Sequence, residues 1–113
     1  MRFPFNATIQ LIQNHATSEQ WRRLFVADVA RQTWLYPAYL KSAAWRAKRE
    51  ERITIDGNHC GICLVNAGPL EVHHRTYARI GNENAKTDLV AVCRCCHREE
   101  HGIKREIAHQ TTY

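Results

Sequence analysis

The sequence contains the stretches Cys60-Gly61-Ile62-Cys63 and Cys93-Arg94-Cys95-Cys96, two C-x-x-C pairs with residues 64–92 between them. Two residues between the cysteines let both thiolates reach one ion, while backbone amides around the turn donate hydrogen bonds to the sulfurs. One such pair also occurs in redox proteins, but two pairs complete a tetrahedral site. We therefore predict a structural zinc site whose ligands are Cys60, Cys63, Cys93 and Cys96. The long span between the pairs must form structure of its own.

The length and composition bound the class of protein. The chain has 113 residues, enough for one compact domain and a short extension and too few for a multidomain enzyme. All 5 cysteines lie between residues 60 and 96, and a reducing compartment favours metal over disulfides. The longest uncharged apolar run, residues 34–40, is too short to span a bilayer. With no apolar segment typical of a signal peptide at the N-terminus, we expect a cytoplasmic protein with no membrane partner.

A helix is predicted near the N-terminus. Thr17 and Gln20 have the spacing of a capping box, and apolar residues at helical spacing follow them. This pattern predicts a helix over about 18–33. We expect it to end before Pro37, because proline biases the preceding residue, Tyr36, toward extended geometry.

A second helix, over about 42–53, is basic. Ser42 is suited to be its N-cap, and Trp45 is expected to face the core. The formal net charge of the chain is +5, and such a charge attracts polyanions. Lys48 and Arg49 are the side chains of this helix that we expect on a phosphate backbone, although a charged helix face is often simply solvated.

Between and after the cysteine pairs the pattern changes. Alternating apolar and polar residues predict a strand over 70–74, and an apolar run predicts a second strand over 89–92. A polar segment rich in Gly and Asn, 75–87, reads as a loop. Helical composition follows from 94 to about 107. On that helix His97 and His101 are four residues apart, the spacing of helical two-histidine metal sites, or else of an ordinary surface pair.

The order of these motifs resembles the HNH endonuclease family. The stretches that carry the resemblance are Leu70-Glu71-Val72-His73-His74-Arg75-Thr76-Tyr77, Gly81-Asn82-Glu83, Asp88-Leu89 and Cys93-Arg94-Cys95-Cys96-His97. Tyr39-Leu40-Lys41-Ser42, with Trp45 and Arg49, also resembles the segment that precedes the first cysteine pair in members of this family, so the resemblance covers about residues 36–103. The resemblance implies an α+β fold with a small ββα-metal core (His-Me finger), a four-cysteine structural zinc site and N-terminal helices. It divides the chain into a helical N-terminal extension (1–35), an HNH nuclease domain (36–108) and a tail (109–113).

The resemblance also implies roles for single residues. By position, His74 is the general base, while His73, His97 and His101 hold a divalent catalytic metal ion. Asp88, the second residue assigned to catalysis, stands where the family has Asn. An ionised Asp88 can orient the loop that follows His74 or bind metal, but it cannot donate a hydrogen bond to phosphate.

These residue types suit phosphodiester hydrolysis. The reaction needs a deprotonated water in line with the leaving oxygen and a cation to neutralise developing charge. Neutral imidazole accepts a proton near pH 7. A three-histidine site favours Mn²⁺, Ni²⁺, Co²⁺ or Zn²⁺, with Mg²⁺ less suited. Adjacent residues of a regular strand point to opposite faces, so we expect the backbone to bend at His73 and His74 for both to serve one phosphate.

The resemblance predicts a metal-dependent HNH endonuclease that nicks or cleaves DNA, as a monomer or homodimer, in a phage, prophage, restriction, homing or toxin role. Arg75 and Arg79 of the loop are expected to join Lys48 and Arg49 on the DNA backbone. The alternative is a catalytically inactive zinc-dependent DNA-binding module. Asp88, which stands where the family has Asn, favours this alternative. A thiol redox protein, the third class, would bind no zinc.

Overall fold

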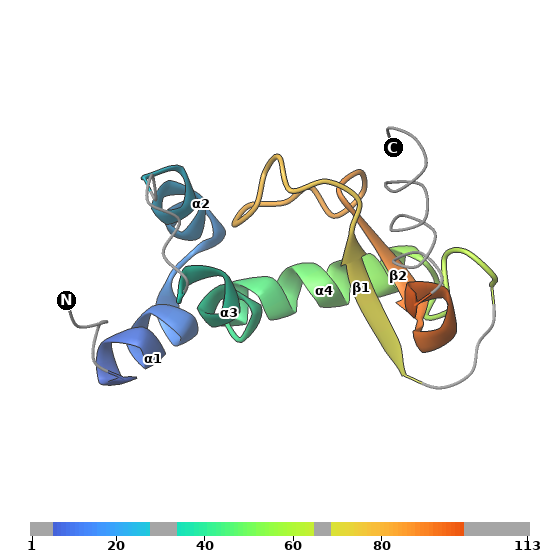
Figure 1. Ribbon diagram of the computed structural model, residues 1–113, viewed down its shortest axis with the longest axis horizontal. Helices are drawn as coiled ribbons and strands as arrows, with labels where there is room; N and C mark the ends of the chain where they lie inside the picture. The colour runs from blue at the N-terminus through green and yellow to red at the C-terminus, as the bar shows by residue number, and fades with distance from the viewer. Residues whose placement is uncertain (1–5, 28–33, 65–68, 99–113) are drawn as a thin grey trace, which may run out of the picture.

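The structure is a computed structural model that describes residues 6–27, 34–64 and 69–98 (Figure 1). These residues form a small α+β fold. Its elements are the helices α1 (Asn6–His15), α2 (Ser18–Ala27), α3 (Leu35–Leu40) and α4 (Ala43–Ile55) and the strands β1 (Leu70–His74) and β2 (Leu89–Cys93). After β2 the chain turns helical over residues 94–98.

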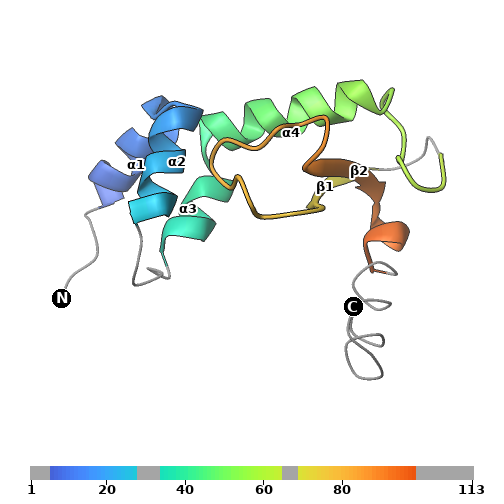
Figure 2. The ribbon, with the colours of Figure 1, turned by 90° about the horizontal axis from the view of Figure 1, so that it is seen from above.

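The elements are arranged around α4. The two strands pair antiparallel, with Leu70 opposite Cys93 and His74 opposite Leu89. The sheet lies alongside the C-terminal part of α4, while α1, α2 and α3 gather at its N-terminal end (Figures 1 and 2). None of the helices in the described ranges is long and apolar enough to cross a membrane.

The predicted helix starts are present. The Thr17 amide donates to Gln20 Oε1 at 2.9 Å and the Gln20 amide donates to Thr17 Oγ1 at 3.1 Å, a complete capping box before α2. Ser42 Oγ accepts the Trp45 amide at 3.1 Å and caps α4. The strands predicted over 70–74 and 89–92 match β1 and β2 to within one residue.

The prediction for Pro37 is wrong. Proline was expected to hold Tyr36 in extended geometry, yet both residues lie in the first turn of α3 (Leu35–Leu40). Proline is tolerated there, because the amides of the first helical turn have no acceptor within the helix. The helix expected over 18–33 is represented by α2, and residues 28–33 lie outside the described part of the chain.

One aromatic core joins the N-terminal helices to the sheet. Trp21 of α2 and Tyr39 of α3 are both fully buried, with ring centroids 5.3 Å apart, and Tyr39 in turn contacts Trp45 of α4 at 5.8 Å. The buried members of this cluster are Trp21, Leu35, Ala38, Tyr39, Trp45, Ala85 and Leu89. The predicted boundary after residue 35 therefore falls within a shared core.

A buried ion pair at the C-terminal end of α4 makes hydrogen bonds to β2 and to the loop between the strands. The Arg52 guanidinium contacts Asp56 at 2.7 and 2.9 Å and donates to the carbonyls of Ala85 and Lys86 at 3.0 and 2.9 Å. Asp56 Oδ2 also accepts the Ala91 amide at 2.9 Å. A buried charge is tolerated when it is paired and hydrogen-bonded in this way. The C-terminal end of α4 is thereby held against the loop between the strands and against β2.

Candidate metal centre and candidate active site

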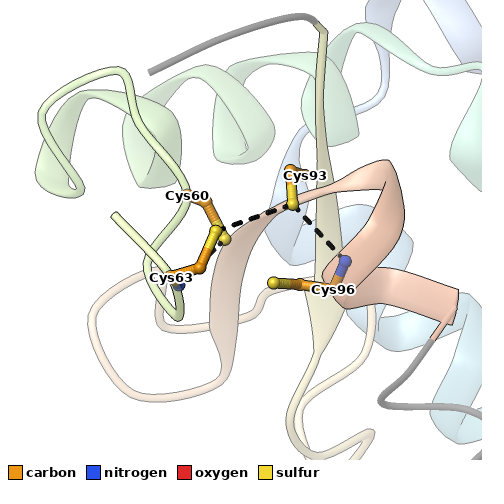
Figure 3. A group of neighbouring side chains, drawn as sticks. All are labelled: Cys60, Cys63, Cys93 and Cys96. Carbon is orange, nitrogen blue, oxygen red and sulfur yellow. Dashed lines mark hydrogen bonds between the residues drawn. The ribbon is translucent and has the colours of Figure 1, made fainter. Parts of the chain in front are cut away.

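The two C-x-x-C pairs meet at one point. Cys60 and Cys63 follow α4, whereas Cys93 ends β2 and Cys96 lies in the helical turn after it; all four sulfurs lie within 4.8 Å of one another (Figure 3). Four sulfur donors this close could hold a metal ion such as zinc. The structure thus confirms the prediction that these four cysteines lie together.

Backbone amides surround the sulfurs. The amides of Ile62 and Cys63 donate to Cys60 Sγ at 3.4 Å, and the Cys96 amide donates to Cys93 Sγ at 3.4 Å. Burial raises the pKa of the Cys60 thiol, but the amides of Cys63, Cys93 and Ile62 outweigh it and lower the pKa to about 6. At Cys60 the local structure thus favours the thiolate, the form that binds a cation, whereas the hydrogen bond to Cys93 raises the pKa of the Cys96 thiol.

The first pair is packed tightly against β2. The Gly61 amide donates to the Ala91 carbonyl at 2.7 Å. A Cβ on Gly61 would lie 2.9 Å from Val90 Cγ2 and 3.1 Å from Asp56 Oδ2, so a larger residue would push this turn away from the strand. Glycine at this position therefore lets the first cysteine pair approach the second.

His74, the predicted general base, ends β1 and is held on three sides. Its ring stacks on Trp45 and on Tyr77, with centroids 4.8 Å apart in both pairs and interplanar angles of 13° and 19°. Its Nε2 lies 2.7 Å from Oε2 of Glu83, a buried residue of the loop between the strands. Two stacked rings and one hydrogen bond leave the imidazole little rotational freedom.

A second histidine group is formed by His73 of β1 and His97 of the helical turn that follows β2. The rings of His73 and His97 have centroids 5.3 Å apart. Glu71, two residues before His73 and so on the same face of the strand, lies 2.7 Å from His97 Nδ1 through Oε2. Imidazole and carboxylate are ligand types that divalent transition metals accept, but among the described residues the group whose ligand atoms lie close enough together to hold an ion is the four cysteines. His101, the third predicted ligand, lies outside the described residues.

One pocket brings the two histidine groups together. It has a volume of about 440 Å³, and its lining includes His74 as well as His73, His97 and Glu71. Arg49 of α4 also lines it, so a positive side chain faces the same space. The pocket is therefore the candidate active site.

The expected bend between His73 and His74 is not present. The strand pairing continues regularly, with His73 opposite Val90 and His74 opposite Leu89. The two side chains nevertheless line one pocket. Among the described residues, β1 pairs only with β2, so its other edge is a sheet edge. Side chains from the two faces of the strand can line one space around such an edge.

Asp88 holds the loop rather than lining the pocket. Its buried carboxylate accepts two hydrogen bonds from Arg79, one of them at 2.8 Å, and others from the Asn84 amide at 2.9 Å and Thr87 Oγ1 at 3.0 Å. The Arg79 guanidinium holds the pKa of Asp88 well below its usual range. These contacts order the loop that carries Glu83, which is one of the two roles considered for Asp88 from the sequence.

The four predicted DNA contacts lie in different surroundings. Arg75 is exposed, and the Arg79 side chain is 52% exposed although it is paired within the loop. Lys48 and Arg49 are half-buried on α4, and Arg49 donates to the Leu70 carbonyl at 3.0 Å. Of these four residues, Arg49 alone lines the pocket.

Two acidic residues of the site received no role from the sequence. Glu71 and Glu83 both lie within the stretches that resemble the HNH family, but glutamate is most often an exposed residue. The observation that points to a role for each glutamate is its contact with a histidine. That contact depends on the packing of the strands and the loop.

Comparison of the chain with protein-family models, with curated proteins and with solved structures finds no match. Function is therefore inferred from the geometry and chemistry of the site itself.

Proposed function

We propose that the protein is a metal-dependent endonuclease of the HNH type that hydrolyses DNA phosphodiester bonds, by nicking or by cleavage. In this proposal β1, β2 and the helix that starts at Arg94 make up a ββα-metal core, and the four cysteines hold structural zinc. The observation that carries the proposal is the shared pocket, which is lined by a restrained histidine, His74, and by the neighbouring pair His73 and His97.

The residues of the pocket can be given separate tasks. His74, as general base, takes a proton from the attacking water. Bound by His73, His97 and the predicted ligand His101, a divalent ion would neutralise charge on the phosphate and on the departing 3′-oxygen. Arg49 uses one donor on the Leu70 carbonyl and keeps others for a phosphate oxygen.

The nature of the donors favours particular metals. Imidazole nitrogen suits Mn²⁺, Ni²⁺, Co²⁺ and Zn²⁺ better than Mg²⁺, which prefers oxygen. Cleavage of supercoiled plasmid across a series of divalent metals is therefore expected to be faster with Mn²⁺ or Ni²⁺ than with Mg²⁺. Faster cleavage with Mg²⁺ would show that the ligand set is wrong.

Single-residue variants test the assignment of roles. His74→Ala is expected to keep the fold, metal binding and DNA affinity and to slow cleavage by about two to four orders of magnitude. His73→Ala is expected to lose the catalytic ion together with activity. His15→Ala is the matched control, because His15 is exposed on α1 and remote from the pocket in the chain.

The outcomes separate the two functional classes. If His74→Ala loses the metal and His73→Ala keeps it, the two roles are exchanged. If both variants cleave as fast as the wild type, the endonuclease proposal fails. If the wild type binds DNA and zinc but cleaves nothing with any metal, the protein is an inactive zinc-dependent DNA-binding module.

A further inference from the structure

We propose that Glu83 is the positioning residue for His74. Its carboxylate holds the ring in the tautomer that carries hydrogen on Nε2, which leaves Nδ1 to accept a proton, and it balances the charge of the imidazolium that then forms. The contribution to cleavage rests on the proposed function. The tautomer does not, because it is a property of the resting protein.

The surroundings of Glu83 account for a carboxylate in the interior. The side chain is fully buried, and both of its oxygens have partners: Oε2 lies 2.7 Å from His74 Nε2, and Oε1 accepts the Tyr39 hydroxyl. An unpaired buried carboxylate would be costly, so these two contacts are what permit Glu83 to be there. They also direct the carboxylate at the imidazole.

Tyr39 determines the direction of the hydrogen bond on Oε1. Burial, followed by the hydrogen bond to Glu83, raises the pKa of Tyr39 above its usual range, so the hydroxyl stays protonated and donates. The same hydroxyl lies 3.2 Å from the Gly81 carbonyl. Glu83 therefore acts as an acceptor on Oε1, and an ionised carboxylate acts as an acceptor on Oε2 as well. His74 Nε2 is then the donor.

The aromatic neighbours restrain the ring of His74. A 180° flip would put a ring carbon where Nε2 contacts Glu83, and the rings of Trp45 and Tyr77, stacked on the imidazole, oppose the rotation that a flip requires. With Nε2 bound inside, Nδ1 is the ring nitrogen left for a water in the pocket that His74 lines. The arrangement follows the logic of the carboxylate–histidine pair in serine hydrolases, where the carboxylate selects the tautomer and stabilises the imidazolium.

The hydrolytic step can be written with its proton and electrons balanced. A water O–H bond breaks and its proton goes to Nδ1 of His74, while the oxygen lone pair forms a bond to phosphorus. The electron pair of the P–O3′ bond leaves with the 3′-oxygen, which takes a proton from solvent. His74 is then an imidazolium whose Nε2–H still faces the Glu83 carboxylate, and it returns its extra proton to solvent.

The first test is spectroscopic and needs no substrate. Nitrogen-15 NMR of the histidine rings in the full-length, zinc-loaded protein, assigned by comparison with His74→Ala, is expected to show the neutral ring of His74 with its hydrogen on Nε2. A neutral ring with its hydrogen on Nδ1 would overturn the proposal. This result is independent of whether the protein cleaves DNA.

The second test uses variants of the carboxylate. Glu83→Gln keeps the shape of the side chain but removes its charge, and it is expected to lower kcat by about two to four orders of magnitude with KM nearly unchanged. Glu51→Gln, the matched control, makes the same change at an exposed glutamate of α4 and is expected to leave kcat unchanged. Zinc content and circular dichroism establish that each variant is folded.

The two proposals fail in different ways. A Glu83→Gln variant that cleaves like the wild type, or that changes KM rather than kcat, would refute the positioning role and leave the endonuclease proposal intact. A wild type that shows the Nε2–H tautomer but no cleavage would refute the endonuclease proposal and leave the positioning of His74 intact. If Glu83→Ala fails to fold, Glu83→Gln and the wild-type spectrum still decide the question.

Discussion

Replacing Gly81 with alanine would test how the loop between the strands is held against α2. This glycine has a φ of +98°, a conformation that favours glycine. A Cβ placed on it would lie 2.7 Å from the Arg22 nitrogen, 2.8 Å from Arg22 Cα and 2.9 Å from the Trp21 carbonyl carbon. These atoms are backbone, and Trp21 is fully buried, so α2 cannot yield as a flexible side chain would.

The cost of Gly81→Ala has two parts. Left-handed backbone at an alanine costs about 1–2 kcal/mol, and overpacking of a well-packed contact costs about 1–3 kcal/mol. We therefore expect the free energy of unfolding to fall by about 2–5 kcal/mol. For a chain of 113 residues this corresponds to a decrease in Tm of roughly 10–20 °C.

Gly57→Ala is the matched control for the backbone term. Gly57 also has a positive φ, +72°, but a Cβ there would meet only the His59 side chain, at 3.3 and 3.4 Å. It should cost about 1–2 kcal/mol. Urea denaturation of the zinc-loaded proteins, followed by circular dichroism, measures both. A Gly81→Ala variant that is no less stable than Gly57→Ala would show that the loop does not pack against α2.

Three further predictions concern the metal, the loop and DNA. Cys60→Ser should lose zinc and unfold, because structural zinc contributes on the order of 10 kcal/mol, whereas Cys95→Ser, outside the four-cysteine group, should keep both; metal content and thermal melting check this. Asp88→Asn should lower the free energy of unfolding by about 1–3 kcal/mol at pH 7. Because the pKa of Asp88 is lowered in the fold, the difference from wild type should shrink as pH falls below about 4; a constant difference would contradict this. The double variant Lys48→Ala, Arg49→Ala should reduce the slope of log affinity against log salt by about one unit per lost phosphate contact, and an unchanged slope removes α4 from the interface.

Local patterns account for much of the fold. The capping box of Thr17 and Gln20, the N-cap Ser42 and the two short apolar strands were all predictable, since each depends on residues a few positions apart. The cysteine cluster was predictable for a different reason. The spacing within each pair is typical of metal-binding cysteines. One tetrahedral ion needs four ligands, so the two pairs were expected to meet whatever path the chain takes between them.

Local sequence patterns are therefore sufficient to predict the cysteine cluster, the helix starts and the two strands. The partners of each polar side chain depend instead on how distant segments pack. The expectation for Pro37 was wrong because proline is compatible both with the end of a helix before it and with the first turn of a new helix. The packing of α3 selects the first turn of a new helix. Glu83 lies nine residues from His74 and 44 from Tyr39, yet it contacts both. No short-range pattern encodes such contacts, because the cost of burying a carboxylate is offset only when distant segments fold together and supply its hydrogen bonds.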